Sequence, residues 1–102
     1  MVQATTPTFV LTLPTTVNLS EAANVYFTLS QGSTIITKSG ENLEISQDGN
    51  EVSVFLSQYD TVNLAVGRAS IQLNWTYNDG SRSCSKIVSI NIDGNLLKEV
   101  VE

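Results

Sequence analysis

Few side chains in this sequence have the chemistry for catalysis or for holding a metal ion. The single cysteine, Cys84, lies among serines, and the chain has no histidine to act as the base that a nucleophile usually needs. The oxygen-rich segment Asp48-Gly-Asn-Glu51 lacks the ligand spacing of a calcium loop and is better explained as a hairpin turn. The other acidic residues are scattered, and the glycines lack a phosphate-binding spacing. The sequence therefore predicts no catalytic, cofactor-binding or metal-binding residue, no cofactor, and a protein that is not an enzyme.

Aromatic side chains are the remaining candidates for a binding site. Trp75 and Tyr77 could form a platform for a sugar ring, but they share their face with Ile71 and Leu73 in a strict alternation with polar residues. Their position on the apolar face of the strand favours burial of Trp75 and Tyr77 in the core over sugar binding. The aromatic side chains expected at the surface, which would mark an interface if they cluster, are Tyr26, Phe55 and Tyr59.

The charge balance of the chain excludes some classes of partner. Ten acidic and five basic residues give a formal net charge of -5, which disfavours nucleic-acid binding because phosphate backbones are also negative. Arg82 and Lys86 are interpreted as solvated surface cations, and Cys84 as a small structural residue. No apolar run approaches the roughly 20 residues of a membrane span, and no signal-peptide pattern is visible. These features predict a soluble protein made in the cytoplasm, without a nucleic-acid or membrane partner.

Short strands are the elements that would position these residues. The clearest signal is a hairpin in which Ile71–Tyr77 runs into the turn Asn78–Ser81 and returns as Lys86–Ile92. The returning arm is expected to place three apolar side chains in the core: Val88, Ile90 and Ile92. Further strands are predicted at Thr8–Leu13, Val25–Gln31, Thr34–Lys38, Leu43–Gln47 and Glu51–Ser57.

The connections between these strands also carry local signals. Ser20–Ala23 resembles one helical turn with Ser20 as its N-cap. Ser57–Thr61 is predicted to cross between sheets, Val62–Val66 to form a short strand or bend, and Gly67 to mark a turn. Seven or eight short strands separated by turns indicate a single all-β domain over residues 1–102, an immunoglobulin-like antiparallel β-sandwich. A small barrel is the alternative.

The two ends of the chain differ from the predicted strands in their pattern of polar and apolar residues. Residues 1–6 form a polar stretch that is expected to be a flexible lead. Residues 95–102 form a tail in which Leu96–Val101 has apolar pairs separated by a charged pair, a pattern that fits an amphipathic helix or a last edge strand. This tail either packs against its own domain or docks on a neighbouring chain.

Several segments together resemble one family. They are Thr8–Pro14, Val25–Gly32 with Ile36–Lys38, Val52–Gln58 with Asp60 and Thr61, and Gly67–Tyr77 with Asp79, Gly80 and Ser85. In this order they are similar to small proteins encoded in phages and prophages of gut Firmicutes, and they resemble the immunoglobulin-like N-terminal domain of phage baseplate upper proteins. The resemblance spans most of the chain, and its motifs are strand and turn patterns.

The resemblance implies a structural or adaptor role in a phage tail or baseplate. The partners would be other phage structural proteins or further copies of this chain, and the protein would end in the virion. The chain lacks the coiled-coil stalk and receptor-binding tip of the baseplate proteins, which argues against direct attachment to a host. The alternative function is a β-sandwich module that binds carbohydrate or another cell-surface ligand.

Overall fold

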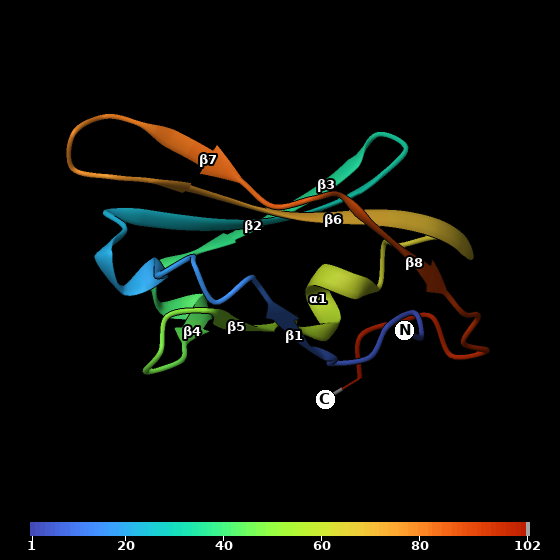
Figure 1. Cartoon of the computed structure of the whole chain (residues 1–102). Helices are drawn as coiled ribbons and strands as arrows, with labels where there is room; N and C mark the ends of the chain where they lie inside the picture. Colours follow the sequence, from blue (N-terminus) through green and yellow to red (C-terminus); the bar gives the residue numbers. More distant parts are fainter. Residues whose placement is uncertain (102) are drawn as a thin grey trace.

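Eight strands form two antiparallel sheets in the computed structural model, which describes residues 1–101 (Figure 1). The smaller sheet has the order β1-β5-β4, and the larger has the order β3-β2-β6, with β7 and β8 both along the outer side of β6. The strands are β1 Thr8–Thr12, β2 Asn24–Gln31, β3 Thr34–Ser39, β4 Leu43–Ile45, β5 Glu51–Phe55, β6 Gly67–Thr76, β7 Arg82–Cys84 and β8 Val88–Ile92. The helical turns are η1 Leu19–Glu21, η2 Gly40–Asn42 and α1 Gln58–Thr61. The predicted all-β sandwich is confirmed.

The connectivity of the two sheets follows the immunoglobulin order. In that fold the strands B, E and D are neighbours in one sheet, and C′, C, F and G are neighbours in the other. Here β1, β5 and β4 correspond to strands B, E and D. In the other sheet β3, β2 and β6 correspond to C′, C and F, and β7 and β8 together take the position of G. An immunoglobulin domain adds a strand A beyond B. Within residues 1–101 no strand pairs with the outer edge of β1, so that edge is open.

The core lies between the two sheets and follows the predicted alternation. On β2, Val25, Phe27 and Leu29 are buried, whereas the side chains between them point away from the core. The ring of Phe9 on β1 stacks on that of Phe27, with 5.9 Å between their centroids, so this pair joins the sheets. Other buried apolar side chains include Leu19, Val52, Val54, Leu56, Leu64, Ala69, Ile71, Leu73, Trp75 and Ile92.

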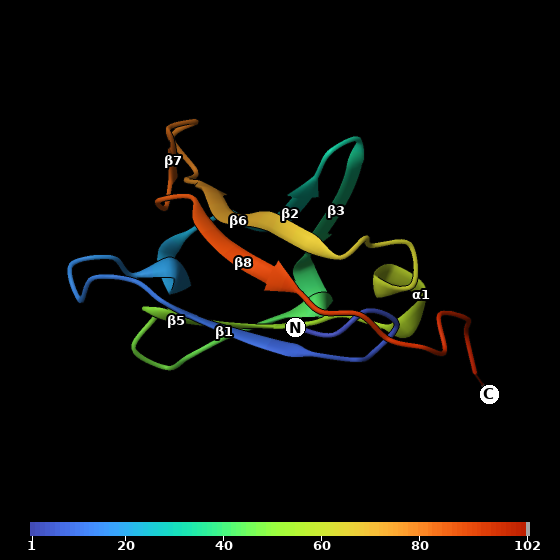
Figure 2. The same cartoon turned by 90° about the vertical axis from the view of Figure 1, so that its right-hand side faces the viewer.

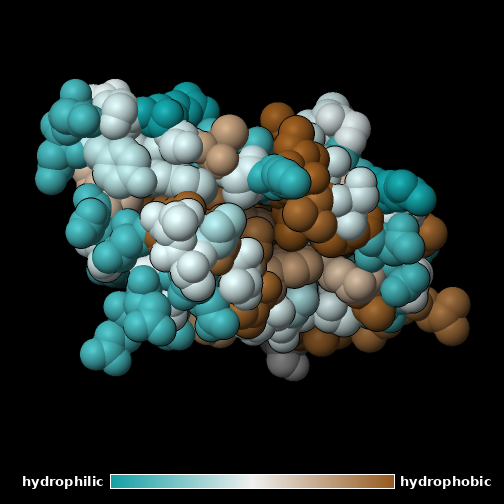
Figure 3. Space-filling view, viewed as in Figure 1, coloured by the Kyte–Doolittle hydropathy of each residue, from teal (hydrophilic) through white to brown (hydrophobic). Residues whose placement is uncertain are grey.

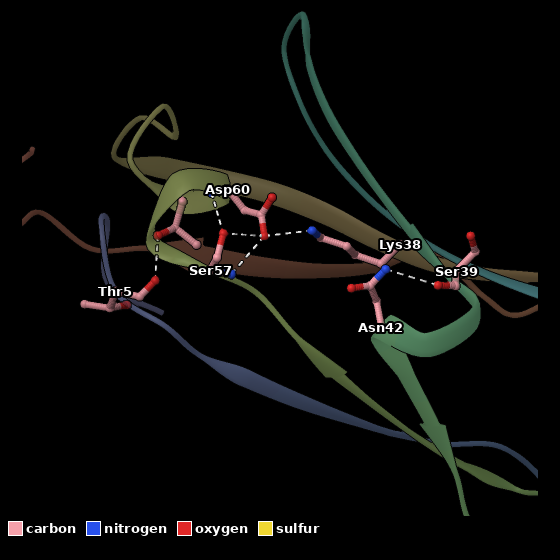
Figure 4. A network of polar contacts seen from close by, with 7 residues as sticks. Thr5, Lys38, Ser39, Asn42, Ser57 and Asp60 are labelled. Atoms are coloured by element: carbon pink, nitrogen blue, oxygen red, sulfur yellow. Dashed lines mark hydrogen bonds and ion pairs between the residues drawn. The ribbon is translucent and has the colours of Figure 1, made fainter. Parts of the chain in front are cut away.

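One end of the sandwich is closed by a polar link that also joins the sheets (Figure 4). Ser57 and Asp60 cap α1 reciprocally, as a capping box, and the Lys38 ammonium of β3 lies 2.9 Å from the Asp60 carboxylate. Partial burial by itself would raise the pKa of Asp60. The hydrogen bonds from Ser57 and the contact with Lys38 outweigh burial, so the pKa of Asp60 lies below its ordinary value.

Within the lead, predicted over residues 1–6, residues 1–5 are hydrogen-bonded to the sandwich. Val2 forms a parallel bridge with Asp93, and the Gln3 amide donates to the Asp93 carbonyl at 2.9 Å. The Gln3 side chain is buried and donates to the Leu64 carbonyl at 2.5 Å. The Thr61 hydroxyl donates to the Thr5 carbonyl at 2.6 Å. The lead therefore lies along the end of β8, beside the residues that begin the tail (Figure 1).

Several local predictions need correction. The N-cap of η1 is Asn18, not Ser20, because the Asn18 side chain accepts from the Ser20 amide at 3.1 Å. β4 ends at Ile45 rather than at Gln47, and of the two alternatives for Val62–Val66, a strand or a bend, the structure has the second, with a turn at Val62–Asn63 and a bend at Val66. The tail forms neither a helix nor a strand in its described part. Gly67 begins β6 instead of marking a turn before it.

Candidate functional site: a groove at the open edge of the sandwich

An apolar groove lies between the two sheets, where the outer edge of β1 faces β7 and β8. Its volume is about 680 Å³, and its lining is mostly apolar, with Lys86 as the one charged side chain among the lining residues. Val10 and Val88, on opposite sides of the groove, are 60% and 48% exposed. Figure 2 looks onto this edge, with β8 above β1, and Figure 3 shows hydrophobic surface running from the β7–β8 connection toward β1.

A one-residue bulge shapes the upper wall of the groove. On β6 two residues separate Ile71 from Asn74, whereas three residues, 85–87, separate their partners Val88 and Cys84. The extra residue shifts the register by one: the returning arm predicted over Lys86–Ile92 begins at Val88, as β8, and a separate strand, β7, precedes it over Arg82–Cys84. Val88, which was predicted to lie in the core, faces the open groove instead.

Ser85 satisfies the backbone of β6 at this bulge. Its amide donates to the Leu73 carbonyl at 2.9 Å, and its hydroxyl accepts from the Leu73 amide at 3.0 Å. The Gln72 side chain donates to the Ser85 carbonyl at 2.9 Å. The Ser85 side chain thus takes the place of the backbone acceptor that the register shift removes, which keeps β6 bonded while the edge strand bends away.

The lower wall of the groove is an unpaired strand edge. The Leu13 amide donates to the Asn50 carbonyl at 2.7 Å, and the Leu56 amide donates to the Pro7 carbonyl at 3.1 Å. Because backbone groups of an antiparallel pair point alternately toward and away from the partner, the groups of Val10 and Thr12 face the open side of β1. Such an edge can accept one more strand.

The predicted aromatic residues do not form a platform in this groove. Trp75 is 3% exposed and donates from Nε1 to the Tyr77 hydroxyl at 3.0 Å, so the prediction of core burial for Trp75 is confirmed. Tyr26 points outward from the larger sheet and Phe55 outward from the smaller one, while Tyr59 lies on α1. The two outward faces lie on opposite sides of the sandwich, so the three exposed aromatics do not make one patch.

A second, polar hollow lies on the outer face of the larger sheet. Its volume is about 410 Å³, and the Arg82 guanidinium donates to the Asn74 side chain at 3.0 Å within it. Its lining consists of Tyr26, Thr28, Thr37, Asn74, Thr76 and Arg82. An aromatic ring beside hydroxyl, amide and guanidinium groups has the composition of a site for a polar ligand.

The remaining candidate residues have simple surroundings. Cys84 is exposed and lines the groove, and Lys86 lies on the same wall. Asp48–Glu51 includes the turn between β4 and β5, where Gly49 has a φ of +78°. Across residues 1–101, no three potential ligands gather to hold a metal ion, and none of the helices is both long and apolar enough to cross a membrane.

The groove was not foreseen from the sequence, because it results from an absent partner strand and a register shift rather than from a motif. The signal available was indirect: the polar run Ser81–Ser85 interrupts the alternation that the returning arm shows from Val88 onward. Comparison of the chain with protein-family models, with curated proteins and with solved structures gave no match.

Proposed function

We propose that this chain is a non-enzymatic structural or adaptor protein that acts through protein–protein contacts at the open edge of its sandwich. The observation that carries this proposal is the apolar groove whose lower wall, β1, has an unpaired edge. A strand from a partner gains backbone hydrogen bonds from β1 and buries apolar side chains between the sheets. Both gains are available at the same place.

The exposed apolar side chains around the groove support contact with a protein. Val10 and Val88 line the groove and are exposed, and Ile87, which precedes Val88 in the chain, is exposed as well. Burying such side chains stabilises a complex by roughly 25 cal/mol for each Å² of apolar surface. Contiguous apolar surface of this kind usually marks an interaction site.

The resemblance to phage proteins supports a place for the chain in a tail or baseplate. Such particles consist of many copies of few proteins, which join through repeated contacts. The acidic net charge of -5 agrees with a role away from packaged DNA. In this proposal the protein is made in the cytoplasm and then enters the virion, where it contacts other structural proteins or further copies of itself.

Mass spectrometry of purified phage particles from the strain that encodes the chain tests this function. We expect the chain in the tail fraction at a constant ratio to the other tail proteins. Val10→Lys in the groove should prevent incorporation, whereas Ile35→Lys, at an equally exposed position on β3, should not. Absence of the wild-type chain from the particles, or equal incorporation of both variants, would overturn the proposal.

A second candidate function is binding of carbohydrate or another cell-surface ligand, and the polar hollow around Tyr26 supports it. A sugar ring would stack on Tyr26 and accept a hydrogen bond from Arg82. A glycan array separates the two functions: saturable binding that is lost in Tyr26→Ala would favour the ligand-binding module. Absence of binding to the array would count against it.

A further inference from the structure

The chain carries a second unpartnered apolar feature besides the groove, namely its tail. Residues 96–101 have no regular secondary structure. Leu96 is fully exposed, and Leu97 and Val101 are about half exposed. An apolar segment that leaves its side chains in water gains free energy when a groove covers them.

The tail starts from a fixed point and leads away from the groove of its own chain. Asn95 is held by Gln3, because its side chain donates to the Gln3 carbonyl at 2.9 Å and its amide donates to the Gln3 side chain at 3.3 Å. At the far end, Gln58 and Val101 exchange two hydrogen bonds beside α1 (Figure 2). No residue beyond Val88 lines the groove among those described, so the groove of the same chain stays uncovered.

The tail and the groove match in pattern, charge and length. In an extended conformation Leu97, Glu99 and Val101 share one face, which is apolar at both ends and acidic in the middle. The groove is apolar and has one cation, Lys86, on its wall. Residues 96–101 would extend over roughly 20 Å at about 3.3 Å per residue, which is enough to run along the five residues of β1.

We propose that residues 96–101 of one copy lie in the groove of a second copy and add a strand to the open edge of β1. This inference rests on the proposed function and names its partner as another copy of the chain. Glu99 then pairs with Lys86 of the second copy, and Leu97 and Val101 cover the apolar floor. Release of the tail from its own chain breaks the two hydrogen bonds between Val101 and Gln58 and uncovers the buried parts of Leu97, Val100 and Val101.

The single cysteine provides a direct test, because Cys84 lines the groove. Wild-type chain is mixed with a Leu97→Cys variant that also carries Cys84→Ser, so that a disulfide under mild oxidation joins one groove to the tail of another copy. The control variant keeps Cys84→Ser and carries Ile35→Cys in place of Leu97→Cys; Ile35 is exposed and lies on β3, the strand at the far edge of the larger sheet. We expect a cross-link yield at least about tenfold above that of the control, because docking raises the effective concentration of the two thiols.

Light scattering of the full chain and of a chain that lacks residues 97–102 gives the second measurement. We expect an oligomer that becomes a monomer when the tail is removed. A cross-link yield equal to the control, a monomeric full chain, or an oligomer that survives the truncation would overturn the tail-in-groove contact. Each of these results can occur while the chain is still found in phage particles, so failure of this inference is distinguishable from failure of the proposed function.

Discussion

Gly49, in the turn between β4 and β5, allows a sharp test of the packing that supports one end of the groove. Its φ is +78°, and a Cβ at this position would lie 2.0 Å from Asn18 Oδ1 and 3.0 Å from the Leu19 amide nitrogen. Gly49→Ala therefore combines a left-handed residue, at about 1–2 kcal/mol, with displacement of the Asn18 cap, at about 1 kcal/mol. We expect the free energy of unfolding to fall by about 2–3 kcal/mol, the sum of these two effects.

The chain contains a matched control for this change. Gly32 also has a positive φ, +56°, but a Cβ there would meet nothing within 4 Å, so Gly32→Ala should cost only the conformational part, about 1–2 kcal/mol. Urea unfolding of both variants measures the difference. In an Asn18→Ala background the cost of Gly49→Ala should approach that of Gly32→Ala, since the closest side-chain atoms are then gone. Equal costs for the two glycines in the wild-type background would refute the reasoning.

Three further predictions concern other parts of the sandwich. Asp60→Asn should lower the free energy of unfolding at neutral pH by about 1–2 kcal/mol. Because the pKa of Asp60 is lowered in the folded state, the extra stability of the wild type over this variant should disappear as the pH falls below about 4. A constant difference between neutral and acid pH in urea unfolding would contradict it. Ser85→Ala leaves the Leu73 amide without its hydroxyl acceptor and should cost about 1–3 kcal/mol. Faster hydrogen exchange at Leu73 checks this, and unchanged protection would speak against the role of the hydroxyl. The fluorescence of Trp75 should be blue-shifted and weakly quenched by iodide, as its burial requires; quenching like that of free tryptophan would contradict that burial.

Features that depend on nearby residues were readable from the sequence. The alternation of Val25, Phe27 and Leu29 with polar residues identifies the buried face of β2, because side chains of a strand point to opposite faces in turn. Asp48-Gly-Asn50 likewise marks the turn between β4 and β5, since glycine tolerates positive φ. These local rules were enough to predict the sandwich and the burial of Trp75.

Features that depend on distant partners were not readable. Val88 keeps the inward phase of Ile90 and Ile92, and it is exposed because the groove that it faces has no covering strand, which nothing in the local sequence reveals. The lead is hydrogen-bonded to residues 91–95, and its own polar composition does not predict these bonds. The candidate site is of the same kind, because a groove beside an unpaired β1 edge is a property of how the strands are connected.

The parallel bridge between the lead and the end of β8 has a consequence during synthesis. The Met1 amino group donates to the Asn91 carbonyl, a partner 90 residues further along the chain. At the roughly 5–20 residues per second of translation, the first residues wait roughly 5–20 s before this partner exists. Until β8 is made, the outer edge of β6 over Gly67–Ile71 lacks its partner strand. A ribosome that stalls before β8 would therefore release a nascent chain with exposed strand edges, which is a substrate for chaperones or for premature association with other nascent copies.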